Sequence, residues 1–421
     1  MKKRVAILLA ASILLLGSAF SASAEAGVPG NSAPAAKRGQ CNDPISNSYD
    51  VTKVPSAIDP DQMLWSFVHM DQYLPHSIIR GGGKVRPFKS GKIVDLSTLT
   101  YQFNGETRQF ADLLNRSRTN GLLVIKDGKI VNEQYFHGNT SCTRFTSWSI
   151  TKSFVSTLVG IAVDEGKIES IDDRVVKYVP ALQGSGYEDA TIRDVLQMSS
   201  GVVWNEDYSD KHSDIWRMVQ DVVFRKMPVL DFVKKLPGGE PHTFNYKSPD
   251  AEVLAYLVEN VYKKPLHKVL SEKLWKPLGM TGDAYLNQDL NDHDFGFSFI
   301  NAPLRDLAKL GQLFLQDGKW RGKQIVSAEW IKEATTPVDA DLQPNEAVPH
   351  FGFQYQWWVP EGAAFGHEFA AIGSYGQYVY VDKDAKVVIV KVSAYPENSI
   401  DQDYEEITAF REIVKALSKK H

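Results

Sequence analysis

Apolar runs near both ends of the folded region predict β-strands. In residues 121–136 (GLLVIKDGKIVNEQYF), two β-rich runs flank Asp127-Gly128, and an Asp-Gly pair is a strong signal for a hairpin turn. After residue 350, the runs FGFQYQWWV, GQYVYVD and KVVIVKVSAY are rich in aromatic and β-branched residues and are separated by turns. The sequence therefore predicts strands both early and late in the chain.

Apolar residues at helical spacing fill the region between these strands. Residues 146–165 predict a largely apolar helix with Thr146 or Ser147 as its N-cap and Gly166 directly after its end. A short second helix is predicted in TIRDVLQMSSG, and further helical stretches such as PDAEVLAYLVENVY and PLRDLAKLGQLFLQDG follow. The C-terminal segment QDYEEITAFREIVKALSKK predicts an amphipathic helix.

This order of elements predicts an α+β fold. We expect one antiparallel sheet, assembled from residues of about 111–145 and 350–421 and flanked by helices. A mainly helical subdomain of about 165–335 is inserted between its two parts. Residues 111–421 then form the main domain, and residues 25–110 form an N-terminal leader and extension.

Composition and charge exclude some classes of function. With 421 residues, 43% of them hydrophobic, the chain is long enough to bury a sizeable core. Its formal net charge of −4 provides no broad positive field, so we exclude nucleic acid as a partner. The pattern indicates no particular oligomeric state.

The first 24 residues have the three parts of a secretory signal peptide. Basic residues 2–4 precede an apolar stretch, which ends before the small-residue cleavage site Ala22-Ser23-Ala24. We expect cleavage there, with no stable membrane span afterwards and a periplasmic or secreted location. An uncleaved membrane anchor is the alternative.

The cysteine and histidine patterns bear on disulfides and metals. Export would place Cys41 and Cys142 in an oxidising compartment, where they either form a disulfide or remain two unpaired thiols. The histidines are scattered, without an HExxH motif or a cysteine pair. We therefore predict neither a metal site nor a cofactor.

The helix predicted at 146–165 contains a Ser-x-x-Lys motif, Ser149 and Lys152. Residues three apart lie on one helix face, and the N–H groups of a first helical turn favour developing negative charge. A serine hydroxyl becomes nucleophilic when a neighbouring base accepts its proton, and burial lowers the pKa of a lysine towards that role. The alternative is a helix-start serine beside a lysine that extends to solvent.

Two later segments carry further candidate residues. TFNYKSPD contains Tyr246 and Ser248 in a turn-rich loop, and EFAAIGSYGQYVYVD contains Ala371-Ile372-Gly373 at the start of a strand. The chain thus has Ser-x-x-Lys, Tyr-x-Ser and small-x-Gly motifs in this order. Taken alone, Tyr246 fits an ordinary core tyrosine with its hydroxyl at the surface better than a catalytic residue, and only the other motifs favour catalysis.

The order and setting of these motifs resemble the serine β-lactamase and penicillin-recognising superfamily. The resemblance extends over about residues 110–415 and is strongest to the class C branch, especially to 6-aminohexanoate-dimer hydrolase-like esterases and amidases. It includes TIRDVLQMSSGVVWNEDY, LRDLAKLGQLFLQDGKW and YQWW followed by AIGSYGQ. It implies a β-lactamase/transpeptidase-like fold.

The resemblance also implies a role for each matching residue. Ser149 would be the acylated nucleophile and Lys152 its general base, Tyr246 would relay a proton to the leaving group, and Ser248 would steady this network. The backbone N–H groups of Ser149 and Ser374 would form the oxyanion hole. The implied substrate-binding positions are Tyr208, Asn301, Trp357, Ala371, Ile372 and Gly373.

Departures from the family pattern narrow the expected substrate. Ala371 stands where β-lactamases and penicillin-binding enzymes carry a lysine or histidine that holds the substrate carboxylate, and Ser248 stands where asparagine is usual. We therefore expect a serine hydrolase acting on a small-molecule ester or amide. A cell-wall peptidase or β-lactamase is one alternative, and a non-catalytic binding protein on the same fold is another.

Overall fold

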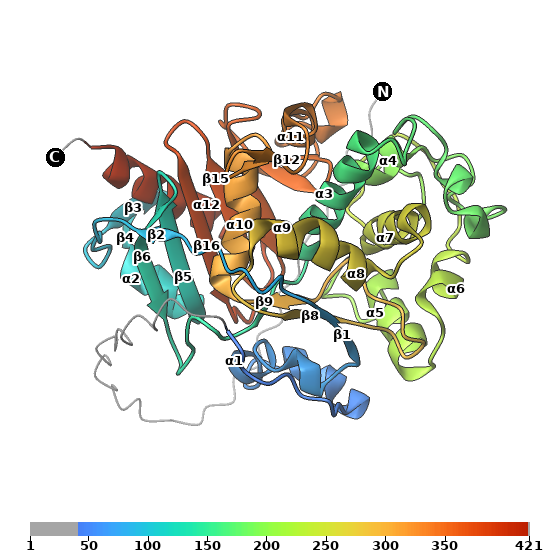
Figure 1. Cartoon of the computed structure of the whole chain (residues 1–421), viewed down its shortest axis with the longest axis horizontal. Helices are drawn as coiled ribbons and strands as arrows, with labels where there is room; N and C mark the ends of the chain where they lie inside the picture. Colours follow the sequence, from blue (N-terminus) through green and yellow to red (C-terminus); the bar gives the residue numbers. More distant parts are fainter. Residues whose placement is uncertain (1–40, 420–421) are drawn as a thin grey trace, which may run out of the picture. The chain divides into compact units, whose positions relative to one another are not determined.

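An eight-stranded sheet forms the centre of the computed structural model, which describes residues 41–419 (Figure 1). The predicted signal peptide, residues 1–24, lies outside the described residues. In spatial order the strands are β12 (Phe351–Gln354), β13 (Trp357–Pro360), β14 (Glu368–Gly373), β15 (Gln377–Asp382), β16 (Val387–Ser393), β5 (Thr119–Lys126), β6 (Lys129–Tyr135) and β2 (Lys89–Ser90). Neighbours pair antiparallel except β2, which pairs parallel with β6. The α+β prediction is confirmed.

The predicted hairpin and its late partner strand form the middle of this sheet. The turn between β5 and β6 contains Asp127 and Gly128, both with positive φ, as an Asp-Gly hairpin turn requires. Strand β5 pairs antiparallel with β16, from Lys126 opposite Val387 to Thr119 opposite Ser393. The sheet therefore joins segments that lie far apart in the sequence.

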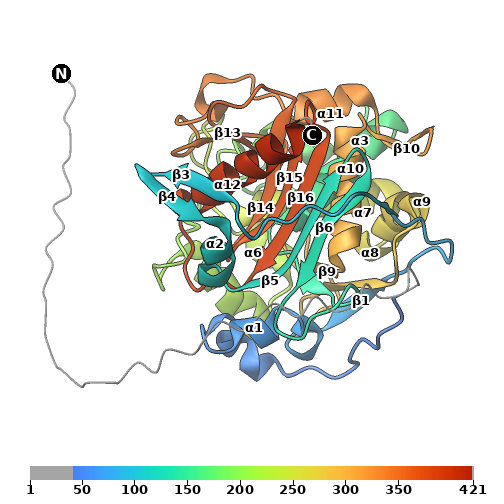
Figure 2. The same cartoon turned by 90° about the vertical axis from the view of Figure 1, so that its left-hand side faces the viewer.

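Alternate residues of each strand face opposite sides of the sheet, so the sheet separates two hydrophobic cores. In β15, Val379 and Val381 face one core, while Tyr378 and Tyr380 face the other. Helix α10 (Leu304–Leu315) covers the first face, and α12 (Ile400–Ser418) and α2 (Phe110–Arg116) cover the second (Figure 2). A Cβ on Gly311 of α10 would lie 2.7 Å from Val388 and 2.8 Å from Val379, so glycine is needed for this close packing.

Most of the remaining helices form a second group beside the sheet, in which α3 packs against both α7 and β14. These helices are α3 (Ile150–Asp164), α4 (Ile192–Leu196), α5 (Asp214–Met218), α6 (Val229–Val233), α7 (Ser248–Tyr262), α8 (Leu266–Leu270), α9 (Lys276–Leu278) and α11 (Ala328–Ala334). Their apolar side chains share the core of the first sheet face. They supply one wall of the candidate site, and the sheet supplies the other.

A second, four-stranded sheet was not predicted. It contains β1 (His76–Ile79), β8 (Ala284–Asn287), β9 (Ile300–Ala302) and β7 (Phe145–Thr146), in that order. Strands of two to four residues are too short for a clear alternating pattern. Two small hairpins complete the strands: β3 (Thr100–Phe103) with β4 (Glu106–Gln109), and β10 (Lys319–Trp320) with β11 (Lys323–Gln324).

The segment before residue 110 packs onto this framework. It includes helical turns at Val51–Ile58 and Met70–Gln72 and the short helix α1 (Met63–Ser66). A disulfide joins Cys41 to Cys142, close to β7. Leu74, Ile79 and Phe88 enter the same core as α3, so this part of the chain contributes directly to the folded body.

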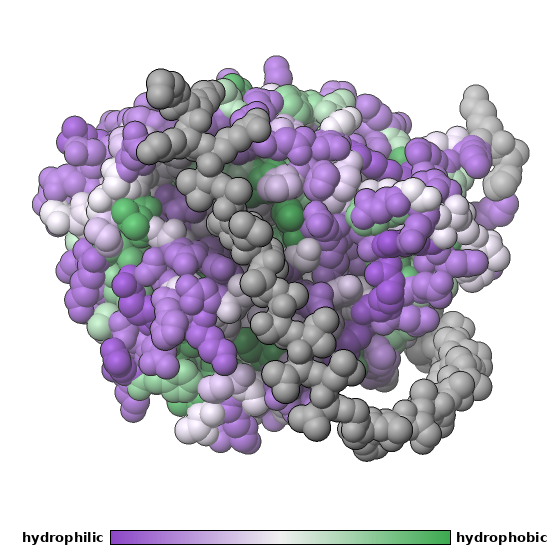
Figure 3. All heavy atoms as spheres, turned by 180° about the vertical axis from the view of Figure 1, so that it is seen from behind, coloured by the Kyte–Doolittle hydropathy of each residue, from purple (hydrophilic) through white to green (hydrophobic). Residues whose placement is uncertain are grey.

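The surface is largely polar where Figure 3 shows it, with hydrophobic patches between hydrophilic groups. Between residues 41 and 419, no helix has both the length and the apolar character that crossing a bilayer requires.

Candidate active site

Ser149 lies at the junction between strand β7 and helix α3. The helix begins at Ile150, with Ser149 as N-cap, so the predicted N-cap at Thr146 or Ser147 was wrong. Thr146 is instead the last residue of β7, paired opposite Asn301. Trp148 has a φ of +47°, an uncommon conformation for a residue with a side chain, and it turns the chain sharply from strand to helix.

The Ser149 side chain contacts Lys152 rather than capping its own helix. Lys152 Nζ donates hydrogen bonds of 2.8 Å to Ser149 Oγ and 2.8 Å to the carbonyl oxygen of Phe297. Both acceptors are uncharged, and no carboxylate among the described residues forms an ion pair with Lys152. Lys152 is only 2% exposed, and Ser149 is 8% exposed. The pair thus lies in an environment that disfavours a charged ammonium.

Burial lowers the pKa of Lys152 to about 8, although the more distant charges of Glu206 and Glu252 act in the opposite direction. A substantial fraction of a lysine with this pKa is neutral near physiological pH. The neutral amine can accept a hydrogen bond and then a proton from Ser149 Oγ. The arrangement therefore provides a serine hydroxyl with an adjacent base.

Tyr246 faces the same pair from the loop before α7. Lys152 Nζ lies 5.2 Å from the centre of the Tyr246 ring, and this ring stacks on Trp358 at 5.3 Å. Burial, together with the negative charge of Glu206, raises the pKa of Tyr246 far above its usual value, while an interaction with Ser149 opposes this shift. Tyr246 is therefore a neutral phenol, suited to donate a proton and unsuited to act as the first base.

Ser248 contacts a carboxylate that the sequence analysis did not single out. Ser248 Oγ donates to Glu206 Oε1 at 2.6 Å, and its backbone N–H donates to Glu206 Oε2 at 2.9 Å. The Tyr208 hydroxyl also donates to Glu206, at 2.9 Å, and Trp204 Nε1 donates to it as well. Ser248 therefore holds Glu206, which also binds Tyr208. Among the described residues, no hydrogen bond joins the side chains of Ser248 and Tyr246.

The end of strand β14 lies directly against Ser149. A Cβ on Gly373 would be 2.5 Å from Ser147 O and 3.1 Å from Ser149 N, so only glycine fits here. Ser374 follows at once and borders the same pocket as Ser149. Ser149 and Ser374, whose backbone N–H groups the sequence analysis assigns to the oxyanion hole, therefore lie at one pocket.

Two pockets open from Ser149. The apolar pocket is lined by Val54, Ala57, Ile58, Met70, Leu74, Trp148, Ser149, Tyr208, Ile215, Trp216, Met218, Val219, Val222, Val223, Phe295, Phe297, Ser298, Phe299 and Tyr375. The polar pocket is lined by Ser149, Glu206, Tyr208, Tyr246, Trp358, Ile372, Gly373, Ser374, Asn398, Ser399, Ile400 and Asp403. Ser149 and Tyr208 border both pockets, whereas Tyr246 borders only the polar one.

Three of the expected substrate-binding residues line neither pocket. Asn301 is fully buried and bonds to Thr146, Asn287 and the Phe299 carbonyl, which supports the second sheet. Trp357 is also fully buried, against Phe314 and Phe369, whereas its neighbour Trp358 lines the polar pocket, because alternate strand residues face opposite sides. Ala371 lies in the core on the α3 side of the sheet.

Other pocket residues were missed by the sequence analysis. Phe297 and Phe299 come from the loop before β9, Trp148 from the strand-to-helix turn, and Asp403 from the first turn of α12. None belongs to a recognisable motif; Trp148 is the chain neighbour of Ser149, and the fold brings the other three to it. The sole signal was the clustering of aromatic residues in DFGFSFI.

Two basic residues, His367 and Lys386, lie near Ala371 in the sequence but outside both pockets. His367 pairs with Asp384 at 2.6 Å, and neither His367 nor Lys386 lines either pocket, so neither replaces the cation missing at Ala371. Within the part of the chain that the structure describes, no group of three or more His, Cys, Asp or Glu side chains could hold a metal ion.

Comparisons with known proteins agree with this geometry. The Beta-lactamase family matches residues 108–409. The 6-aminohexanoate-dimer hydrolase of Paenarthrobacter ureafaciens is 28% identical over 346 residues, covering 79% of this chain and 86% of the relative.

Solved structures share the fold. A Bacillus anthracis protein proposed to be a 6-aminohexanoate-dimer hydrolase superposes with a TM-score of 0.78 at 23% identity, covering 86% of this chain and 96% of its own. A family VIII carboxylesterase superposes with a TM-score of 0.55 at 16% identity, covering 72% and 97%. The resemblance expected from the motifs is confirmed: the chain belongs to the beta-lactamase family and is a serine hydrolase.

Proposed function

We propose that this protein hydrolyses carboxylic esters or small amides through an acyl-Ser149 intermediate. The observation that carries the proposal is the 2.8 Å contact between Lys152 Nζ and Ser149 Oγ, made by a buried lysine without a carboxylate partner in the described part of the chain. A buried ammonium without a counter-ion is unfavourable, and a role as general base gives the neutral amine a purpose.

Acylation begins when neutral Lys152 accepts the proton of Ser149 Oγ as the oxygen attacks the substrate carbonyl carbon. The carbonyl oxygen becomes an oxyanion, which the backbone N–H groups of Ser149 and Ser374 stabilise. The tetrahedral intermediate then collapses, the bond to the leaving group breaks, and Tyr246 donates a proton to the departing oxygen or nitrogen. Lys152 returns its proton to Tyr246, and water then cleaves the acyl-serine by the same route.

The apolar pocket supports a neutral acyl chain. Its walls are aliphatic and aromatic side chains, and the described residues that line it include no charged group. A substrate carboxylate placed there would lose its hydration without gaining a counter-ion. This favours the ester and amide reading over a β-lactam substrate, whose carboxylate needs a cation.

We also propose that the enzyme acts in the periplasm or outside the cell. The N-terminal segment has the composition of a signal peptide, and the Cys41–Cys142 disulfide is typical of exported proteins. Mass spectrometry of the mature chain tests this directly, since an N-terminus close to residue 25 is expected.

The test of the function is intact-mass spectrometry after brief exposure to p-nitrophenyl butyrate or to a penicillin, together with release of nitrophenol. We expect a butyryl adduct on Ser149, continued turnover, and little penicillin adduct. Ser149→Ala should lose both the adduct and the turnover. Ser156→Ala is a matched control, because Ser156 lies buried in the same helix and its hydroxyl has no hydrogen-bond partner.

Two outcomes would contradict the proposal. Rapid, stable acylation by penicillin would assign the protein to the cell-wall enzymes. Absence of an adduct from either compound would make it a binding protein on this fold.

A further inference from the structure

The two pockets at Ser149 differ in whether Tyr246, the proposed proton donor, lines them. Tyr246 borders the polar pocket and not the apolar one. The group that receives the proton from Tyr246 must be the leaving group, since its bond to the carbonyl carbon is the one that breaks. On the proposed function, the leaving group therefore occupies the polar pocket and the acyl chain occupies the apolar pocket.

The polar pocket has the composition of a site for an organic cation. The stacked rings of Tyr246 and Trp358 form an aromatic wall, and both residues are only half-buried, so their rings are accessible. The described residues that line the pocket include two carboxylates, Glu206 and Asp403, and no lysine or arginine. Aromatic faces beside a carboxylate attract ammonium groups through charge and through the ring quadrupole.

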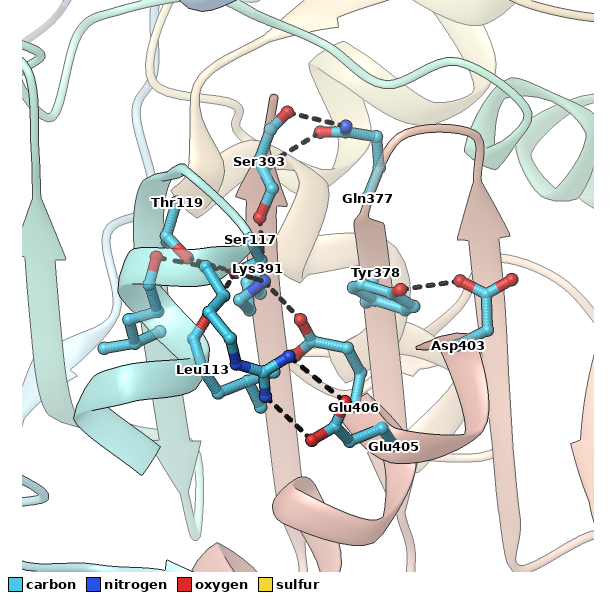
Figure 4. Close-up of polar contacts among 12 residues, drawn as sticks. Leu113, Ser117, Thr119, Gln377, Tyr378, Lys391, Ser393, Asp403, Glu405 and Glu406 are labelled. Atoms are coloured by element: carbon cyan, nitrogen blue, oxygen red, sulfur yellow. Dashed lines mark hydrogen bonds and ion pairs between the residues drawn. The ribbon is translucent and has the colours of Figure 1, made fainter. Parts of the chain in front are cut away.

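The two carboxylates differ in what already binds them. Glu206 accepts hydrogen bonds from Ser248, Tyr208 and Trp204, so its oxygens are occupied. Asp403 has a single hydrogen-bond partner among the described residues, the Tyr378 hydroxyl, which donates to Oδ1 at 2.6 Å (Figure 4). Its other oxygen, Oδ2, has no such partner.

The surroundings of Asp403 do not neutralise it. The positive charge of Lys391 acts on Asp403, but Lys391 Nζ pairs with Glu406 at 2.7 Å, and Figure 4 shows this pair apart from the Asp403–Tyr378 contact. Glu406 adds a second negative charge to the environment of Asp403. Asp403 is thus an acidic group at the pocket wall without an ion-pair partner of its own.

We propose that the polar pocket is a leaving-group subsite in which Asp403 selects esters or amides whose leaving group carries an ammonium group. The inference rests on the proposed function and adds the charge class of the substrate. The same subsite disfavours leaving groups that end in a carboxylate, because two negative charges would face each other in a partly buried site.

The test compares two butyrate esters of nearly equal shape, butyrylcholine and 3,3-dimethylbutyl butyrate, which differ in the charge of the leaving group. Burial raises the pKa of Asp403 to about 7, so kcat/KM is measured at about pH 8.5, where the carboxylate is ionised. We expect the wild type to prefer the choline ester by about tenfold or more. Asp403→Asn should lower this ratio by about tenfold.

Asp401→Asn is the matched control. Asp401 lies on the same helix, its side chain is 74% exposed, and it does not line the pocket, so the ratio should stay at the wild-type value. An unchanged ratio in Asp403→Asn, or a wild type without preference for the choline ester, would overturn the inference. With either of these results, hydrolysis of 3,3-dimethylbutyl butyrate by the wild type would still support the proposed function.

A measurement on the wild type alone covers the case in which Asp403→Asn does not fold. Tetramethylammonium should inhibit hydrolysis of p-nitrophenyl butyrate competitively, at a concentration about tenfold lower than its uncharged counterpart neopentyl alcohol. Equal inhibition by the two compounds would contradict the subsite. If no ester is hydrolysed through Ser149, the proposed function and this inference fail together.

Discussion

Lys152 and Lys391 are both buried, on opposite faces of the central sheet, and their partners differ. Lys391 Nζ donates to Glu406 at 2.7 Å and to the hydroxyls of Ser117 and Ser393, so its charge is compensated. Among the described residues, the hydrogen bonds of Lys152 Nζ go to a serine hydroxyl and a carbonyl oxygen, and both acceptors are uncharged. The comparison teaches that a buried lysine within an ion pair stabilises the fold, whereas one without a carboxylate partner is available for proton transfer.

Exchanging each lysine for methionine gives the largest expected contrast. Lys152→Met should slow acylation by about 10³-fold or more, because Ser149 loses its base. Stopped-flow release of nitrophenol from p-nitrophenyl butyrate measures this rate. The double variant Lys391→Met/Glu406→Leu should acylate at close to the wild-type rate. An equal loss in both variants would remove the distinction between the two lysines.

The free energy of unfolding, unlike the acylation rate, should depend strongly on the Lys391–Glu406 ion pair. Lys391→Met alone leaves the Glu406 carboxylate buried and unpaired, and we expect the free energy of unfolding to fall by about 3–5 kcal/mol. Adding Glu406→Leu should restore most of this loss, since both charges are then gone. Urea unfolding followed by circular dichroism is the measurement. If the double variant is as unstable as the single one, packing rather than charge accounts for the effect.

Lys152→Met should stabilise the protein by about 1–3 kcal/mol at pH 7. The pKa of Lys152 is about 8 in the native state and 10.5 in the unfolded chain, so between these values the unfolded state binds a proton that the native state lacks. The wild-type free energy of unfolding therefore rises with pH over this window, and the advantage of the variant shrinks. A constant difference from pH 7 to about 10.5 would contradict this assignment.

The smallest effect is the pH dependence of acylation itself. Only neutral Lys152 accepts a proton, so the wild-type acylation rate should rise about tenfold per pH unit up to about 8 and then level off. Pre-steady-state rates with p-nitrophenyl butyrate provide the profile. The acylation rate of the Lys391→Met/Glu406→Leu variant should rise with pH in the same way. An acylation rate that already levels off below about pH 6.5 would instead indicate a carboxylate base.

The sequence predicted those parts of the molecule whose signals are local. The Asp127-Gly128 hairpin, the late β-branched strands and the spacing of Ser149 and Lys152 each depend on neighbouring residues, and the structure contains all of them. The start of α3 was misplaced because Trp148 adopts a left-handed conformation that no local pattern indicates.

The remaining site residues depend on long-range packing. Trp357 and Trp358 can be assigned to core and pocket only once the pairing of β13 shows which of its alternate residues face the core. Glu206 and Asp403 both follow Ser149 in the sequence, by 57 and 254 positions, and only the fold brings them to the pocket that Ser149 borders. Asn301 resembled a pocket residue from its position in the chain, but the unpredicted second sheet uses its side chain internally.

The pairing of β5 with β16 has a consequence for when the molecule can fold. Strand β5 ends at Lys126, yet its neighbour in the sheet lies at Val387–Ser393, so the middle of the sheet cannot close until nearly the whole chain has been synthesised. Closing so long a loop before its contacts form makes folding slow. During this delay β5 keeps one edge unpaired, and a ribosome-bound chain should be a client of holding chaperones rather than a partly active enzyme.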